Sequence, residues 1–272
     1  QKRCSNTAPR RLHERGLRDN SNGDGKSPGP QNKFGATPMT EAPTTLGLLP
    51  VRGGSQGLIG KNSKPLRGRP LMGWAAQALG QASGVDLAYC STDSPQLAEI
   101  ARQYGLAAPS LRPEKLAGPD SLVADTVSFV LDELSKDGLE FAQVVIVQAT
   151  SPFVTARDIT DVVRELSKPE VDSVVTVARV PDDYHPSLMY QSVNGSLSIA
   201  ANASESFVRR QDRSPWFRRV GLVLGFGVQP FLQTGSFLGG VVHTIEVETD
   251  RAVNIDDAAD FAAAERLGEM YL

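Results

Sequence analysis

Short apolar runs alternate with helix-like segments from residue 46 onward, and this alternation limits the possible folds more than any other feature of the chain. We predict strands over residues 46–51, 86–90, 143–148 and 173–180, and helices over residues 70–81, 94–104, 120–135, 155–167 and 257–271. Strands that alternate with helices form parallel β-α-β units, with helices on both faces of one sheet. The predicted fold class is therefore α/β, with a doubly wound, mostly parallel sheet.

The regular alternation fails between about residues 181 and 221. Asn194-Gly195 is a hairpin signal, and a polar, arginine-rich stretch follows it. We interpret this segment as a small insertion that serves as a substrate lid or as a contact between subunits. A strand-like pair and the helix over residues 257–271 then complete one predicted domain, residues 44–272.

The first 43 residues differ in composition from the rest of the chain. Residues 1–38 hold eight Lys or Arg and three Asp or Glu, a net charge of +5, whereas the remainder holds 20 basic and 28 acidic side chains. This head has no apolar periodicity, so it cannot bury enough surface to offset the entropy of ordering. We predict a disordered basic tail or a non-native leader over residues 1–43. Nucleic acid is not a predicted partner, because the head lacks interleaved aromatic residues.

Hydropathy and cysteine content limit the setting of the protein. The longest nearly uncharged stretch, around residues 221–231, is interrupted by glycines and is too short to cross a bilayer. No membrane partner is therefore predicted. Cys4 and Cys90 are the only cysteines, which argues against a disulfide framework and for a reducing, cytoplasmic location.

A glycine-rich turn, RGGSQGLIGKN at residues 52–62, follows the first predicted strand. Its spacing excludes a Walker loop, because Gly60-Lys61 precedes Asn62 rather than Ser or Thr, and it also lacks the spacing of a dinucleotide fingerprint. Glycines still let backbone N–H groups approach phosphate oxygens, and Arg52 and Lys61 supply positive charge. The pattern predicts a polyphosphate site of another kind, with an ordinary strand-to-helix turn as the alternative.

Six further blocks follow this loop in order: STD at 91–93, LRPEKLAGPDS at 111–121, QATSP at 148–152, YHP at 184–186, RRQDRSPWFRRVG at 209–221 and VNIDDAADF at 253–261. Together with the loop they resemble the acylneuraminate cytidylyltransferase family, the CMP-sialic acid synthetases, from residue 46 to about residue 270. The resemblance implies a Rossmann-like nucleotidyltransferase sheet and a homodimer in which the insertion lies at the dimer contact.

The resemblance also implies a reaction. It is the Mg²⁺-dependent transfer of CMP from CTP to the anomeric hydroxyl of a nonulosonic, sialic-type acid, with release of pyrophosphate. CTP and an acidic sugar are the implied partners, and Mg²⁺ is the implied cofactor. Two alternatives stay open: a nucleotidyltransferase for another sugar such as Kdo, and a catalytically weak relative that binds sugar nucleotides.

Site residues follow from the same motifs. The implied catalytic residues are Arg52, Lys61 and Asp256. The implied nucleotide-binding residues are Arg52, Ser55, Gln56, Lys61, Asn62 and Arg112, and the implied sugar-binding residues are Gln148, Arg210, Gln211 and Phe217. The structural alternatives are a surface arginine for Arg112 and a solvated basic loop for residues 208–219.

Asp256 is the implied Mg²⁺ ligand, with Asn254 beside it, because a hard cation prefers oxygen ligands. The competing interpretation is that Asp256 caps the helix that follows, a role worth about 1 kcal/mol. Three positions depart from the family pattern: Gln56 replaces a usual Lys, Asn254 a usual Asp, and Val220 a usual Asn on the sugar side. We therefore expect slower transfer, one Mg²⁺ rather than two, and an altered sugar site.

Overall fold

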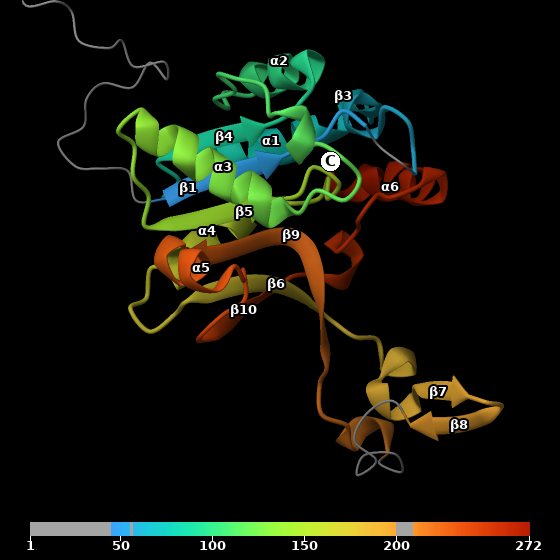
Figure 1. Cartoon of the computed structure of the whole chain (residues 1–272). Helices are drawn as coiled ribbons and strands as arrows, with labels where there is room; N and C mark the ends of the chain where they lie inside the picture. Colours follow the sequence, from blue (N-terminus) through green and yellow to red (C-terminus); the bar gives the residue numbers. More distant parts are fainter. Residues whose placement is uncertain (1–44, 55–56, 200–208) are drawn as a thin grey trace, which may run out of the picture. The chain divides into compact units, whose positions relative to one another are not determined.

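A central sheet of six strands organises the residues that the computed structural model describes, which are 45–54, 57–199 and 209–272 (Figure 1). The strand order is β10-β6-β9-β5-β1-β4. The bounds are β1 Thr45–Pro50, β4 Leu87–Ser91, β5 Gln143–Val147, β6 Ser173–Arg179, β9 Phe217–Gly227 and β10 Val242–Glu246. Strand β9 is antiparallel to both neighbours, whereas the other pairs are parallel. The predicted mostly parallel α/β sheet is confirmed.

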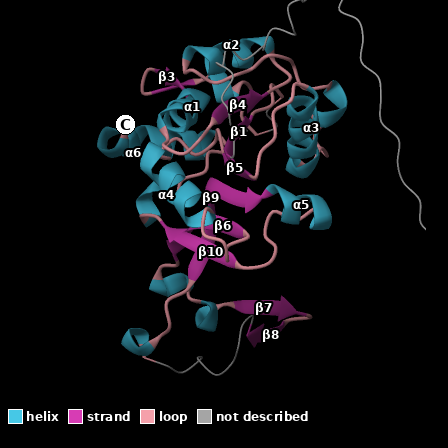
Figure 2. Ribbon diagram, turned by 90° about the vertical axis from the view of Figure 1, so that its left-hand side faces the viewer, coloured by secondary structure: helices cyan, strands magenta, loops and turns pink. Residues whose placement is uncertain are grey.

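Helices cover both faces of this sheet (Figure 2). Their bounds are α1 Leu71–Gln81, α2 Pro95–Gln103, α3 Val123–Lys136, α4 Ala156–Leu166, α5 Val228–Thr234 and α6 Ala258–Tyr271. Side chains alternate between the two faces along each strand. Leu46 and Leu48 thus share a core cluster with α3 and α5, while Leu49 shares another with α1, α2 and α4. Because both faces are covered, the central strands β1 and β5 are mostly apolar and buried.

Four details of the elements differ from the predictions. Helix α3 begins at Val123 rather than at residue 120. Helix α5 was not predicted, because its seven residues are too few to display a helical period. The predicted final strand pair consists of β9 and β10, but these two do not pair, since β6 lies between them. Strand β9 also starts inside the predicted insertion, at Phe217, because that residue pairs with Arg179 of β6.

Between β6 and β9 the chain leaves the sheet, and we name residues 180–216 the extension. Its described parts carry their own two-stranded sheet, β7 Tyr190–Val193 and β8 Ser196–Ile199 (Figure 1). The turn residues Asn194 and Gly195 have φ of 51° and 81°, the left-handed conformation of a two-residue hairpin. The predicted hairpin is confirmed. A hydrogen bond of 2.8 Å from the Val180 N–H to the Trp216 carbonyl joins the two ends of the extension.

The carboxyl edge of the sheet brings distant segments together. Strand β1 lies between β4 and β5. The next strand of the sheet after β1, which is β4, pairs with one edge of β1, and β5 pairs with its other edge, so the strand order reverses at β1. In open α/β sheets ligands bind where the strand order reverses in this way. The short strands β2 Pro65–Leu66 and β3 Arg69–Pro70 follow the loop after β1, and Leu66 packs in one cluster with Phe261 of α6.

Among the described helices, none is both long and apolar enough to cross a membrane.

Candidate active site

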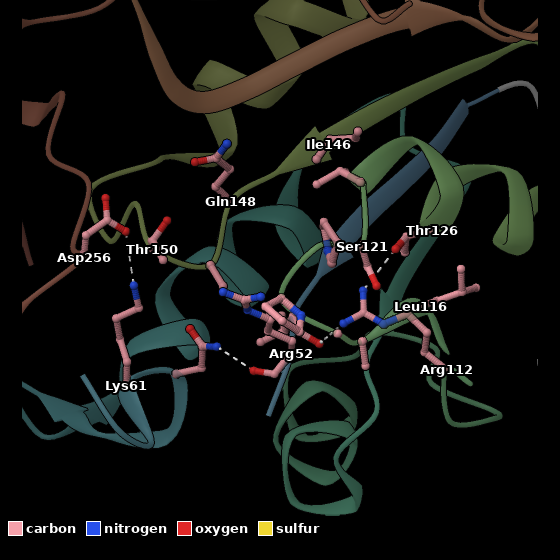
Figure 3. Close-up of a pocket in the computed structure, with 18 of the residues that line it drawn as sticks. Arg52, Lys61, Arg112, Leu116, Ser121, Thr126, Ile146, Gln148, Thr150 and Asp256 are labelled. Carbon is pink, nitrogen blue, oxygen red and sulfur yellow. Dashed lines mark hydrogen bonds and ion pairs between the residues drawn. The ribbon is translucent and has the colours of Figure 1, made fainter. Parts of the chain in front are cut away.

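A cavity of about 580 Å³ lies at the carboxyl ends of β1 and β5, where the strand order reverses (Figure 3). Six of the predicted site residues line this cavity: Arg52, Lys61, Asn62, Arg112, Gln148 and Asp256. They belong to segments that follow β1, β4 and β5 and to the segment before α6. Only the folded sheet places these segments side by side.

Lys61 and Asp256 meet at the cavity although 195 residues separate them in the chain. Lys61 begins a 3₁₀ helix, Lys61–Ser63, directly after Gly60, whose φ of 66° is left-handed. Its Nζ donates a hydrogen bond of 2.6 Å to the Ile255 carbonyl and lies 3.3 Å from Asp256 Oδ1 (Figure 3). These two oxygens compensate the burial of the ammonium group.

Gly57 lets the loop after β1 pass close to the segment before α6. A Cβ at position 57 would collide with the Asp256 carbonyl oxygen and would lie 3.3 Å from the carbonyl carbon. A larger residue would therefore push the loop away from Asp256. Two predicted nucleotide-binding residues of this loop, Ser55 and Gln56, lie outside the described residues.

The helix after Asp256 is capped by the next residue. Asp257 Oδ1 accepts hydrogen bonds from the backbone N–H groups of Ala259 and Asp260, at 2.8 and 2.9 Å, and Asp260 completes a capping box. The interpretation of Asp256 as the cap is therefore wrong. The Asp256 carboxylate is 70% exposed, and its Oδ2 accepts a hydrogen bond from Asn254 Nδ2. It faces the cavity rather than the helix.

Arg112 is only 8% exposed, so the alternative of a surface arginine is wrong. Its Nη1 donates to Thr126 Oγ1 and its Nη2 to the Val51 carbonyl, both at 3.2 Å (Figure 3). Burial lowers the pKa of Arg112, and the carboxylate of Asp93, 3.8 Å from Nη2, acts in the opposite direction. The guanidinium stays protonated at neutral pH, because its ordinary pKa is so high. A fixed positive charge therefore borders the cavity.

Two buried polar atoms beside the cavity have no hydrogen-bond partner within the described part of the chain, Arg112 Nε and Asn62 Oδ1. The Asn62 side chain is oriented by its Nδ2, which donates to the Arg52 carbonyl at 3.0 Å. A buried polar atom without a partner costs about 1–3 kcal/mol. A ligand that offers one acceptor to Arg112 and one donor to Asn62 would recover this cost.

Gln148 directly follows β5 and lies beneath the bend of β9, apart from Arg112 and Arg52 (Figure 3). Thr150 lies close by, between Gln148 and Asp256. The Thr150 carbonyl accepts a hydrogen bond of 2.9 Å from Ile255 N, which ties the loop after β5 to the segment before α6. The cavity thus has a cationic side at the loop after β1 and an uncharged polar side at the end of β5.

Two other predicted sugar-binding residues, Gln211 and Phe217, do not line the cavity. Arg210 begins the 3₁₀ helix Arg210–Asp212, and its side chain lies outside what the structure describes. Gln211 is exposed, and Phe217 is 44% exposed at the start of β9. Val220, expected on the sugar side, is instead buried in the core, which corrects that prediction. A single copy of the chain does not bring Gln211 and Phe217 to the cavity.

Sequence reasoning missed two residues that orient the site. Asp93 Oδ1 accepts a hydrogen bond of 2.8 Å from the Gly53 N–H and also faces Arg112, so it links the loop after β1 to the end of β4. Its place in the STD block directly after a strand was the available signal. Thr126, which orients Arg112, lies within α3 and has no distinguishing signal in the sequence.

A divalent cation that arrives with a phosphate fits beside Asp256. Within the described residues, no group of three or more His, Cys, Asp or Glu side chains is placed to hold a metal ion. Proteins commonly bind Mg²⁺ through one or two carboxylates, with waters and substrate phosphates as the other ligands. The exposed carboxylate of Asp256, next to Asn254 and the cationic loop, matches a site of this kind.

Comparison with known families gives one consistent result. A family model described as cytidylyltransferase matches residues 46–262. The CMP-N,N'-diacetyllegionaminic acid synthase of Legionella pneumophila subsp. pneumophila is 29% identical over 226 residues, which cover 83% of this chain and 96% of that protein. The N-acylneuraminate cytidylyltransferase A of Danio rerio is 26% identical over 253 residues, 93% of this chain but 55% of that protein. The chain thus spans about half the length of the second relative.

A solved structure agrees at the level of the fold. It is described as CMP:2-keto-3-deoxy-manno-octonic acid synthetase complexed with CTP, and it matches with a TM-score of 0.62 at 17% identity. The match covers 84% of this chain and 100% of that one. At this identity the likeness shows the fold alone, and it confirms the Rossmann-like nucleotidyltransferase sheet.

Proposed function

The chain belongs to the cytidylyltransferase family and is a nucleotidyltransferase, and from this premise we propose its reaction. CMP passes from CTP to the anomeric hydroxyl of an acidic sugar of the sialic or legionaminic type, and pyrophosphate is released. One observation carries this proposal: Arg52, Lys61 and Asp256 surround a single cavity. A cationic loop opposite a carboxylate suits a nucleoside triphosphate and its divalent cation.

In the proposed reaction the sugar hydroxyl oxygen bonds to the α-phosphorus of CTP and loses its proton to water. The bond from that phosphorus to the oxygen bridging to the β-phosphate breaks, and pyrophosphate carries away the electron pair. Such transfers depend on positioning and on neutralising phosphate charge. Arg52 and Lys61 face the phosphates, while the glycines of the loop after β1 let backbone N–H groups approach them.

Asp256, with Asn254 beside it, is the proposed holder of Mg²⁺. When bound, Mg²⁺ neutralises phosphate charge and orients the triphosphate. Lys61 contributes by holding the Asp256 segment through the Ile255 carbonyl. Removal of Mg²⁺ with a chelator should therefore stop pyrophosphate release without unfolding the protein, because the exposed Asp256 carboxylate keeps its contacts with Lys61 and Asn254.

The nucleoside and the sugar occupy different sides of the cavity in this proposal. The unpartnered Arg112 Nε and Asn62 Oδ1 receive the nucleoside, because they are a donor and an acceptor already buried beside the cavity. Gln148 receives the sugar, since a neutral amide can bind hydroxyl groups in either role.

We propose that the protein acts as a homodimer in which the extension of one copy approaches the cavity of the other. Gln211 lies within the extension and Phe217 directly follows it, and neither lines the cavity of its own chain. Arg210 belongs to the same 3₁₀ helix as Gln211. The extension also exposes apolar side chains, of which Tyr190 and Leu197 are examples. The cytoplasmic location suggested by the low cysteine content stays a prediction.

Pyrophosphate release is the direct test of this function. The purified chain is incubated with CTP, Mg²⁺ and, in separate reactions, sialic, legionaminic, pseudaminic and Kdo acids, and pyrophosphate is measured. We expect release with a nine-carbon acid and none without sugar. Release with Kdo alone would support the alternative sugar. Binding of CTP without release for any acid would support a catalytically weak relative and would contradict the proposal.

A further inference from the structure

Strand β9 carries a bulge at the edge of the cavity. Val175 of β6 pairs with Leu224, but Val177 pairs with Arg219, so β9 takes five steps along its chain where β6 takes two. Bulges of this kind bend a strand and often lie beside active sites, where they re-aim side chains. Figure 1 shows β9 turning sharply before it runs beside β5, and Figure 3 shows this turn above Gln148.

Two hydroxyl groups hold the bulge in place. Thr176, which is fully buried, accepts a hydrogen bond of 3.1 Å from Val223 N through its Oγ1. The same oxygen lies 3.1 Å from the Val220 carbonyl and 2.9 Å from the Val223 carbonyl, either of which can accept its proton. Ser151 Oγ donates to the Gly221 carbonyl at 3.2 Å. The bulge is therefore anchored from β6 and from the loop after β5.

Gly221, within the bulge, provides the space that the Gln148 side chain occupies. A Cβ at position 221 would collide with Gln148 Oε1 and would lie only 2.8 Å from Gln148 Cδ. Gly221 is not among the glycines with positive φ, so the room that it leaves for Gln148, rather than its backbone conformation, favours glycine here. The exposed Gln148 side chain thus lies against bare backbone, and a Cβ at position 221 would displace its amide.

We propose that Gly221 is a positioning residue for the acceptor sugar, acting through Gln148. This inference rests on the proposed function, in which Gln148 meets the sugar. With glycine at position 221, the Gln148 amide has room beside β9 at the carboxyl end of β5, where the sugar is proposed to bind. Gly221→Ala should displace the amide and weaken binding of the acidic sugar, while the nucleotide side, built from Arg112 and Asn62, should be unaffected.

A double-mutant cycle tests this inference, with Gly221→Ala, Gln148→Ala and the double variant compared to the wild type. KM is measured separately for the acidic sugar and for CTP. We expect Gly221→Ala to raise the sugar KM about tenfold and to leave the CTP KM within about twofold. In the Gln148→Ala background, Gly221→Ala should have no further effect, because the displaced amide is already absent. The matched control is Gly239→Ala, whose Cβ would meet no atom closer than 3.8 Å.

Each outcome decides the inference. Additive effects of the two substitutions, or a rise in the CTP KM, would overturn it. If Gly221→Ala does not fold, the double variant should fold, because removal of the Gln148 amide opens the space; an unfolded double variant would contradict the proposal. If the wild-type chain releases no pyrophosphate with any acid, the proposed function itself is wrong. Failure of the Gly221 inference and failure of the proposed function are therefore distinguishable.

Discussion

The cavity and the extension depart from the usual distribution of side chains in opposite ways. Around the cavity, charged and polar groups are buried: Lys61, Asn62 and Arg112 are each 7–8% exposed. In the extension, large apolar groups are exposed: Tyr190 is 56% and Leu197 is 71% exposed. Buried charge and exposed apolar surface are both costly for an isolated chain.

The contrast indicates what each region needs from outside the chain. The cavity has fixed hydrogen-bond donors and acceptors that a polar, anionic ligand would satisfy. The extension has exposed apolar area that contact with another protein surface would bury. The proposed dimer would satisfy the second need, as CTP and an acidic sugar would satisfy the first. The predictions below test whether the two regions respond separately, in order of decreasing expected effect.

Asp256→Ala should cause the largest loss, about 100-fold or more in turnover, because a positioned charge at the transition state is removed. Its thermal unfolding midpoint should fall only slightly, because Lys61 keeps its hydrogen bond to the Ile255 carbonyl. Asp257→Ala is the matched control from the adjacent position. It should lower stability by about 1 kcal/mol through loss of the cap and leave turnover nearly unchanged. The reverse pattern would show that the roles of the two aspartates were assigned wrongly.

Arg112→Lys should raise the CTP KM about tenfold, because the lysine keeps the charge but loses Nε and the planar fork. The KM for the acidic sugar should change little. Arg102→Lys, on α2 away from the cavity, serves as the control. Equal effects of Arg112→Lys on both KM values would contradict the separation of a nucleoside side from a sugar side.

Leu197→Asp in the extension should weaken self-association about tenfold if the exposed apolar surface is buried in a dimer. Analytical ultracentrifugation over a range of concentrations measures this change. Leu232→Asp on α5, where the leucine is also exposed, is the control and should leave association unchanged. A wild-type chain that is monomeric at every concentration would contradict the dimer directly.

The smallest expected effect is a loss of stability at acid pH, which arises at Asp158 of α4, away from the extension. Burial raises the pKa of Asp158, but hydrogen bonds from Arg251 and Thr155 outweigh this and hold its pKa below the ordinary value. Its stabilisation is therefore present above the unfolded pKa of about 4 and is lost as the pH falls through the folded pKa. Acid unfolding followed by circular dichroism should show this loss of stability. In Asp158→Asn, stability should depend less on pH over the same range. An unchanged acid slope in Asp158→Asn would contradict the assignment.

Prediction from sequence succeeded where the deciding interactions are local. Strands β1 and β5 are visible as apolar runs, and the hairpin at Asn194-Gly195 follows from conformations that few other residues adopt. Prediction was least accurate where partners are distant. The antiparallel direction of β9 depends on its place between β5 and β6, and the burial of Arg112 depends on Thr126 and Val51.

The amino-acid sequence by itself determined the class of the fold, the phosphate-type loop after β1 and the membership of a nucleotidyltransferase family. These follow from periodicity, glycine placement and motif order, all of which are properties of neighbouring residues. The tertiary structure alone decided that Asp257 rather than Asp256 caps α6, that Lys61 meets Asp256, and that Val220 faces the core. Such contacts depend on the directions of side chains from segments far apart in the chain, and these directions are set only when the sheet and its helices pack together.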